Sequence, residues 1–180
     1  MITKILNFNN QKDKDFIIND PILEKTFKDY INFNQEPLTA DQIFKKCKNI
    51  IFSFAILPSQ GIVSGAILTQ YPDTLYISDV YSLVENIGGC TKVIENLLNF
   101  LWDKQKLQFK DNLNVTLGVA KINKYAIKCY TKFGFVEKFD PKAFDNFQPM
   151  ILTKEAYIEK YILPQTEKKL QARQNYKFMN

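Results

Sequence analysis

The stretch that decides the fold is NVTLGVAKINKYAIKCYTKFGFVEK, residues 114–138. Its pattern predicts a buried strand at 114–119, a short polar turn, and an amphipathic helix at 124–133 that leads into a second strand. Asn123 stands in the turn, and Tyr130 falls on the apolar face of the helix. An asparagine before a helix and a tyrosine on its inner face can serve either structure or chemistry, so the rest of the chain must decide between the two.

Composition limits the classes of protein to consider. The 180 residues are 46% apolar and 24% charged, which is ordinary for one globular domain. We expect an intracellular, cytoplasmic protein without membrane contact, because the chain has no long apolar run and its start, MITKILNFNNQKDKDF, has no secretory signal pattern. Three widely spaced cysteines predict neither a disulfide framework nor a metal site. The absence of histidine excludes a histidine-based triad and a histidine-ligated metal.

The net charge of +5 is partly local, because four basic residues crowd the C-terminus: Lys168, Lys169, Arg173 and Lys177. A basic tail can favour phosphate-rich partners. Aromatic residues are not interleaved with these charges as a nucleic-acid platform requires, so a solvated helix face is the favoured interpretation and nucleic acid is not an expected partner. The sequence leaves open whether the chain forms a homodimer.

Strand and helix signals alternate along the chain. The expected elements are an edge strand at 2–8, a helix capped by Asp20 with Pro21 at its first position, a helix from 39 or 41 through Cys47, strands at 49–57, 61–71 and 74–84, a helix at 92–104, the strand and helix described above, and a last strand at 149–153. This order predicts an α+β layered fold, a mixed and mostly antiparallel sheet of six to seven strands with helices on both faces. We expect one domain at 1–154 and a C-terminal helical extension or tail at 155–180, interrupted at Pro164.

The segment VENIGGCTK, residues 84–92, lies between a predicted strand and a predicted helix. Adjacent glycines allow close approach of a ligand, and the first turn of a helix can bind an anion through its backbone amides. Lys92 could add a charge to a bound phosphate. The spacing matches neither the Walker nor the dinucleotide-binding pattern, and a plain connecting turn explains the glycines equally well.

The stretch at 114–138 favours the phosphate-binding interpretation of these glycines over a plain turn. It closely resembles the C-terminal signature of the GNAT superfamily, the acetyl-coenzyme A (acetyl-CoA) dependent N-acetyltransferases. The signature positions are taken by Asn123, Ala126, Ile127, Tyr130, Gly134 and Phe135. The resemblance implies the layered fold predicted above, acetyl-CoA as co-substrate, and direct transfer of the acetyl group to a primary amine on a small molecule or a protein.

The same resemblance implies which residues bind the co-substrate. Residues 74–84 look like the family's fourth strand, where a faint likeness to diamine acetyltransferases also places an acidic residue at Asp79. Residues 86–92 look like its pyrophosphate-binding loop. The implied set is Ser82, Leu83, Val84, Ile87, Gly88, Gly89, Cys90, Thr91, Lys92, Asn123, Ala126 and Tyr130. The loop departs from the family pattern, with Asn86 where an arginine or glutamine is usual and Thr91 where a glycine or alanine is usual.

The resemblance also implies catalytic roles. Tyr130 would give a proton to the leaving thiolate, while backbone N–H groups near Leu83 and Val84 would polarise the acetyl carbonyl. The alternative is that Tyr130 is an aromatic residue of the core without a catalytic role. Asp79 or Glu85 would accept the proton of the amine.

Three further expectations concern side chains near these residues. In a regular strand Asp79 shares a face with Tyr81 and Leu83, and Ser78 faces the other way. Asn123 either binds the cofactor or caps the helix. Cys90 and Cys129 are expected to be packing residues.

Two hypotheses follow for the whole chain. The first is an N-acetyltransferase whose acceptor is a polyamine-like molecule, an amino sugar, a lysine side chain or a protein N-terminus. The alternative is a catalytically impaired protein of the same fold that serves as a binding or structural subunit. The altered loop favours the alternative, and the retained Asn123 and Tyr130 favour the enzyme.

Overall fold

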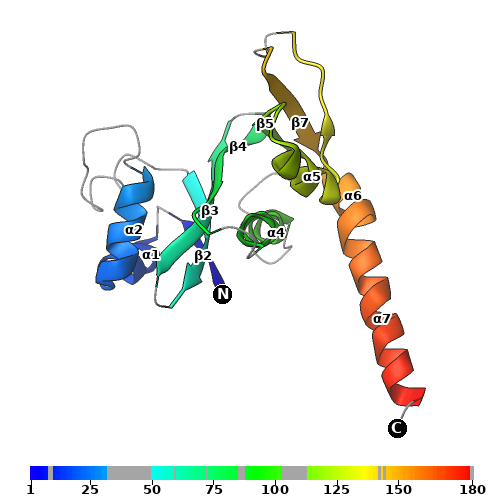
Figure 1. The fold of residues 1–180 in the computed structure, drawn as a ribbon, viewed down its shortest axis with the longest axis horizontal. Coiled ribbons are helices and arrows are strands. Elements are labelled where there is room, and N and C mark those ends of the chain that lie inside the picture. Colours follow the sequence, from blue (N-terminus) through cyan, green and yellow to red (C-terminus); the bar gives the residue numbers. More distant parts are fainter. Residues whose placement is uncertain are drawn as a thin grey trace. The chain divides into compact units, whose positions relative to one another are not determined.

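The computed structural model describes residues 1–7, 10–31, 50–58, 60–71, 73–84, 88–102, 113–141, 143 and 145–178. The chain divides into two compact units, Met1–Phe109 and Lys110–Asn180 (Figure 1).

The first unit is a four-stranded antiparallel sheet with helices packed on it. Its described elements are β1 (Ile2–Asn7), α1 (Gln11–Ile18), α2 (Pro21–Ile31), β2 (Ile50–Leu57), β3 (Gly61–Gln70), β4 (Thr74–Ser82) and α4 (Gly89–Trp102). The strands lie in the order β1-β2-β3-β4, and every neighbouring pair is antiparallel. The predicted edge strand and the three-stranded meander are therefore confirmed.

A local signal explains the start of α2. The side chain of Asp20 accepts hydrogen bonds from the N–H groups of Ile22 and Leu23 at 2.9 and 3.1 Å, so the predicted cap of α2 is confirmed. Helix α1 was not predicted. It buries a single residue, Ile17, so its sequence has no apolar stripe at helical spacing. The helix predicted from 39 or 41 through Cys47 lies outside the described residues.

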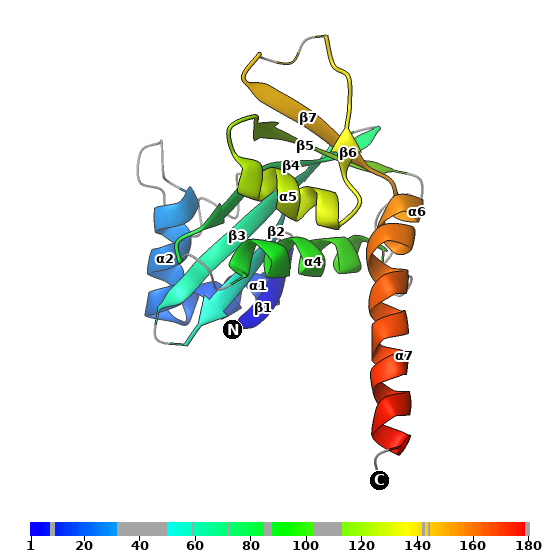
Figure 2. The same ribbon diagram turned by 45° about the vertical axis from the view of Figure 1, so that its right-hand side comes forward.

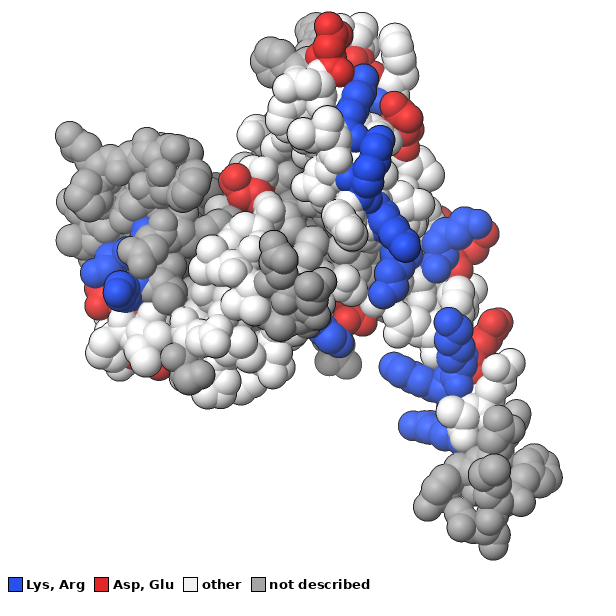
Figure 3. All heavy atoms as spheres, viewed as in Figure 1, with Lys and Arg blue, Asp and Glu red and all other residues white. Residues whose placement is uncertain are grey.

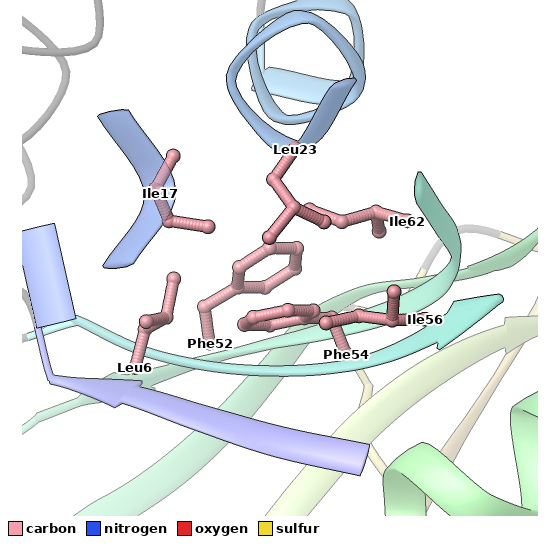
Figure 4. Packing of buried hydrophobic residues seen from close by; sticks show 7 residues of the cluster. All are labelled: Leu6, Ile17, Leu23, Phe52, Phe54, Ile56 and Ile62. Carbon is pink, nitrogen blue, oxygen red and sulfur yellow. The ribbon is translucent and has the colours of Figure 1, made fainter. Parts of the chain in front are cut away.

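Alternation along β2 places helices on both faces of this sheet. Phe52 and Phe54 stack with ring centroids 5.3 Å apart, in a buried cluster that faces α1 and α2 (Figure 4). Ser53, between them, faces the other way and donates to the carbonyl of Val93 in α4 at 2.8 Å. Figure 1 shows α1 and α2 on one side of β2 and β3 and α4 on the other. The apolar residues of α4, spaced as an amphipathic helix requires, are buried at Val93, Ile94, Leu97, Leu98 and Leu101, and Trp102 on the same stripe is half-buried.

The second unit has a three-stranded antiparallel sheet and a long C-terminal helix. Its described elements are β5 (Asn114–Ala120), α5 (Lys124–Lys132), β6 (Val136–Glu137), β7 (Phe147–Leu152), α6 (Lys154–Tyr157), the π-helical turn η1 (Ile158–Ile162) and α7 (Leu163–Phe178). The strand order is β5-β7-β6. The last strand begins earlier than predicted, at Phe147, because it pairs along the whole length of β5.

The C-terminal helix continues through Pro164, so the predicted interruption is wrong. In Figure 2, α6, η1 and α7 form one continuous rod. The N–H of Leu163 donates to the carbonyl of Ile158, five residues back, as in a π-helix. Proline cannot donate a backbone hydrogen bond and its ring crowds the preceding turn, and the wider π turn just before Pro164 accommodates both effects.

Two tyrosines attach this helix to its own unit. Tyr157 and Tyr161 are buried, and the ring centroid of Phe133, at the end of α5, lies 6.4 and 4.5 Å from theirs. Beyond this cluster the described side chains of α7 are exposed or half-buried, including Leu163 and Leu170. Within the described ranges, no helix combines the length and the apolar character needed to cross a membrane.

Candidate functional site

The end of β4 and the start of α4 contain most of the predicted cofactor-binding residues. Strand β4 ends at Ser82, and α4 begins at Gly89. Glu85, Asn86 and Ile87 lie outside the described residues, so the second candidate base and two positions of the loop are not placed.

Gly89 is a packing residue. It is buried, and a Cβ built on it would collide with Ser64 Oγ and stand 2.9 Å from Ser64 Cβ and 3.2 Å from Ser82 Oγ. The hydroxyl groups of Ser64 and Ser82 are themselves hydrogen-bonded at 2.9 Å, which joins β3 to β4. The first residue of α4 therefore rests directly on this serine pair, and only glycine leaves room for it.

Gly88 has a different role. Its φ of +70° is unfavourable for other residues, and a Cβ built on it would meet nothing within 4 Å. The N–H of Lys92 donates to the Gly88 carbonyl at 3.0 Å, so the first turn of α4 closes on this residue. Of the two glycines, Gly88 is the one whose backbone is exposed and can be approached by a ligand.

The backbone at the end of β4 is partly engaged. The N–H of Leu83 donates to the carbonyl of Val63 in β3 at 2.7 Å, so this group is engaged within the sheet, and polarisation of an acetyl carbonyl by N–H groups near Leu83 and Val84 stays a prediction. The hydroxyl of Ser82 donates to the carbonyl of Val84 at 2.8 Å. The N–H of Val84 therefore stays the predicted donor at this position.

A β-bulge brings both Ser78 and Asp79 to the surface. Ile67 of β3 pairs with Asp79, and Leu68 pairs with Ile77, so Ser78 is the extra residue. Both Ser78 and Asp79 are exposed. The expectation that they face opposite sides assumed a regular strand, and the bulge interrupts the alternation on which it rested.

Tyr81 is a residue whose environment the sequence reasoning missed. It lies opposite Gly65, where an added Cβ would collide with the Tyr81 ring and stand 2.7 Å from Phe52 Cε2. The ring packs against the buried cluster that faces α1 and α2, and this burial raises the pKa of its hydroxyl. Tyr81 is therefore a neutral phenol two residues from Asp79. A glycine inside a predicted strand, Gly65, was the available signal.

Thr91 and Lys92 occupy the first turn of α4. Thr91 is half-buried, and the exposed Lys92 forms an ion pair with Glu95 at 3.5 Å. An exposed ion pair of this kind is weak, so the ammonium group can exchange Glu95 for a phosphate. Cys90, in the same turn, is half-buried, as is Cys129 in α5.

In the second unit, Asn123 caps α5. Its side-chain oxygen accepts the N–H of Ala126 at 3.0 Å, which is the bond expected of an N-cap. The side chain of Asn123 is exposed, and Ala126 is half-buried. The structural interpretation of Asn123 is thus supported, and its binding role stays a prediction.

Tyr130 lies on the buried face of α5, as the periodicity predicts. The residue is 6% exposed, and its ring centroid is 5.8 Å from that of Phe135. The Tyr130 carbonyl accepts the N–H groups of Phe133 and Phe135, which ends the helix tightly. Gly134 follows with a φ of +100°, and a Cβ there would stand 2.9 Å from the carbonyl oxygen of Ala156. Gly134, between Phe133 and Phe135, is therefore a steric requirement of this corner.

Comparison with known proteins identifies the fold. No protein-family model and no curated protein matches the sequence. Solved structures do match. The spermidine/spermine N-acetyltransferase SpeG of Vibrio cholerae has 17% identity and a TM-score of 0.54, with 89% of this chain and 98% of that chain covered. An acetyltransferase of the GNAT family from Streptococcus pneumoniae has 16% identity and a TM-score of 0.54, covering 84% and 99%.

A third structure was solved with a ligand. The PaiA N-acetyltransferase of Thermoplasma acidophilum, in complex with coenzyme A, has 11% identity and a TM-score of 0.52, covering 85% of this chain and 99% of that chain. The predicted fold class, a mostly antiparallel mixed sheet with helices on both faces, is confirmed by these likenesses. The chain has the fold of the GNAT N-acetyltransferases.

Proposed function

We propose that the protein is an N-acetyltransferase that moves an acetyl group from acetyl-CoA to a primary amine by direct attack. The observation that carries this proposal is the buried Tyr130 within the Asn-Ala-Ile-Tyr-Gly-Phe signature, on a chain that has the fold of this enzyme class. Residues 1–154 would carry the reaction, and 155–180 would be an extension.

The first turn of α4 supports co-substrate binding. The open side of Gly88 and the backbone N–H groups of a helix start suit a diphosphate, because the helix dipole favours an anion there. Lys92 would add a positive charge. Thr91 is half-buried in the same turn, where its hydroxyl can donate to a phosphate oxygen.

The reaction requires a neutral amine, a polarised carbonyl and a proton for the leaving group. Acetyl-CoA supplies the activated acetyl group as a thioester. Asp79, exposed by the bulge, would take one proton from the ammonium form of the acceptor, directly or through water. The amine nitrogen then forms the new bond to the acetyl carbon as the carbon–sulfur bond breaks. The nitrogen releases its second proton to water, which leaves the neutral amide, and the proton on Asp79 also passes to solvent.

The remaining steps need a hydrogen-bond donor and an acid. The N–H of Val84 would stabilise the oxyanion, and the hydroxyl of Tyr130 would give its proton to the thiolate. The tyrosinate then recovers a proton from solvent.

Calorimetric titration with acetyl-CoA tests the co-substrate assignment. We expect binding by the wild-type chain, an affinity about tenfold lower for Lys92→Glu, and no change for the control Lys12→Glu on α1, since a tenfold loss corresponds to about 1.4 kcal/mol. Gly89 is unsuitable for this test, because any side chain there disturbs the serine pair. An absence of heat at millimolar acetyl-CoA would contradict the assignment.

The class of amine that accepts the acetyl group can be identified with a panel of candidate substrates. The structural likeness to a spermidine/spermine N-acetyltransferase puts polyamines first in that panel. An amino sugar, a lysine peptide and a peptide with a free N-terminus complete it. Release of the coenzyme A thiol, followed with a thiol reagent, identifies the acceptor.

A further inference from the structure

Charge is distributed very unevenly between the two units. Residues 110–180 contain twelve lysines and one arginine against seven aspartates and glutamates, a net charge of +6. Residues 1–109 contain eleven lysines and twelve acidic residues, a net charge of −1. The basic character of the protein therefore belongs to the second unit, and asymmetry of this kind is typical of proteins that bind polyanions.

The outer face of α5 concentrates this charge. Lys124, Lys128 and Lys132 follow one another at intervals of four residues, which places them on one face of the helix, and all three are exposed. Lys121, also exposed, precedes the helix in the turn. The sequence from 121 to 132 contains no acidic residue. Figure 3 shows basic side chains gathered over the region where Figure 1 draws α5.

This arrangement opposes the stability of the helix. Like charges four residues apart each cost about 0.2–0.5 kcal/mol, and a lysine at the first helical position, Lys124, also opposes the helix dipole. Among the described rings, only that of Tyr161 makes a cation–π contact with a lysine of this face: the ammonium of Lys132 lies 5.9 Å from its centroid. Lys132, in the last turn, favours the helix dipole. Helix stability does not explain the other three lysines, so a negatively charged partner is the better explanation for them.

Two large exposed side chains interrupt the lysines. Tyr125, directly after Lys124, is 91% exposed, and Ile122, directly after Lys121, is 90% exposed. An exposed aromatic ring between cations is the combination with which proteins bind single-stranded nucleic acid, because the cations contact phosphates and the ring stacks on a base. The C-terminal tail lacked this interleaving, and α5 has it.

The C-terminal helix favours nucleic acid over a lipid surface. Its exposed residues include Lys168, Lys169 and Arg173, and Figure 3 shows basic side chains along α7. An amphipathic helix that lies on a bilayer needs a broad apolar face. The described side chains of α7 offer only Leu163 and Leu170 as large exposed apolar groups.

We propose that the basic face of α5, defined by Lys121, Lys124, Tyr125, Lys128 and Lys132, binds single-stranded nucleic acid. The lysines contact successive phosphates, Tyr125 stacks on a base, and α7 extends the positive surface. This binding goes beyond acetyl transfer and needs neither acetyl-CoA nor an amine acceptor.

Fluorescence anisotropy of a labelled 20-nucleotide RNA of mixed sequence tests the proposal, with the full chain and no acetyl-CoA, between about 50 and 200 mM salt. We expect the triple variant Lys124→Gln/Lys128→Gln/Lys132→Gln to bind at least about tenfold more weakly and to lower the salt slope by about 2, since each phosphate contact on a single strand contributes about 0.7. The control Lys12→Gln/Lys14→Gln/Lys25→Gln, on the first unit, removes the same charge and should bind as the wild type does.

Tyr125→Ala provides a second arm that does not depend on the folding of the triple variant, because this side chain is almost fully exposed. We expect binding about fivefold weaker or more, with the salt slope unchanged. Any of four results would overturn the proposal: no RNA binding by the wild type at low salt, equal losses in the two triple variants, no loss in Tyr125→Ala, or displacement of the RNA by acetyl-CoA. Binding to phosphatidylserine vesicles without binding to RNA would assign the face to a membrane surface instead.

Discussion

Gly89 rests on Ser64, so closely that a Cβ at position 89 would collide with the serine hydroxyl and stand 2.9 Å from Ser64 Cβ. The start of α4 is thereby fixed on β3, next to the hydrogen bond between Ser64 and Ser82. The close approach that the adjacent glycines allow is used by the protein itself at Gly89. The exposed backbone at Gly88 is what the loop offers to a ligand.

Substitution of Gly89 should destabilise the first unit. We expect Gly89→Ala to lower the free energy of unfolding by about 1–3 kcal/mol, because overpacking of a tight contact costs that much. Ser64→Gly in the same chain should restore part of the loss, since it removes the atoms that the new Cβ meets. Urea unfolding of the two single variants and the double variant measures this coupling.

Gly88→Ala is the matched control for that experiment. Its loss should be about 1–2 kcal/mol and should arise from the positive φ alone, so Ser64→Gly should not restore it. A loss at Gly88 that Ser64→Gly repairs, or no loss at Gly89, would show that the contact between α4 and β3 is looser than described.

Tyr81 should make stability depend on pH in the alkaline range. Burial raises the pKa of its hydroxyl in the folded state, while the unfolded chain keeps the ordinary value of about 10. The contribution of the neutral phenol is therefore complete below about pH 10 and is lost as pH rises toward the folded-state pKa. Urea unfolding between about pH 8 and 11 should show a smaller alkaline loss in Tyr81→Phe than in the wild type. Identical pH profiles would mean that the phenol is solvated.

Asn123 should act as a helix cap. Asn123→Ala removes the oxygen that accepts the Ala126 N–H, so we expect the free energy of unfolding to fall by about 1 kcal/mol, and Asn123→Ser should retain most of it. Calorimetry with acetyl-CoA separates capping from binding. An affinity that falls in Asn123→Ser, whose cap is intact, would assign a binding role to the asparagine side chain.

The aromatic attachment of the C-terminal helix should contribute more to stability than the length of that helix. Tyr161→Ala removes a buried ring whose centroid lies 4.5 Å from that of Phe133, and should lower the free energy of unfolding by about 3 kcal/mol. Deletion of 163–180 should cost less, because the described side chains it removes, at 163–173, are mostly exposed. Thermal unfolding of both variants compares them, and a deletion that costs more than Tyr161→Ala would show that α7 packs on the protein.

The sequence predicted the features of the chain that depend on local patterns. The three extended segments of the meander, the cap at Asp20 and the apolar stripe of α4 each follow from a few neighbouring residues, and the structure has all of them. The order of strand and helix signals predicted the fold class, and the signature around Tyr130 implied the same fold. The glycine and the buried tyrosine of that signature are fixed by the geometry of one corner.

Features that depend on pairing between distant residues were not predicted. The bulge at Ser78 arises from the register between β3 and β4, and the hydrogen bond from Leu83 to Val63 depends on where that register ends. The helix continues through Pro164 because of the π turn before it, and no sequence pattern at 158–162 indicates such a turn. Contacts of this kind also decided which glycine of the loop faces the protein.

Turnover measured by release of the coenzyme A thiol tests the central claim most directly. The assay compares the wild type, Tyr130→Phe and the control Tyr71→Phe, an exposed tyrosine on the first unit, with spermidine and then the other amines as acceptors. If Tyr130 is the acid that protonates the thiolate, kcat in Tyr130→Phe should fall about 100-fold or more while the affinity for acetyl-CoA stays within a few fold of wild type, and Tyr71→Phe should be unaffected. Equal turnover in wild type and Tyr130→Phe, or thiol release with no acceptor in a wild-type chain that binds acetyl-CoA, would contradict the proposed reaction.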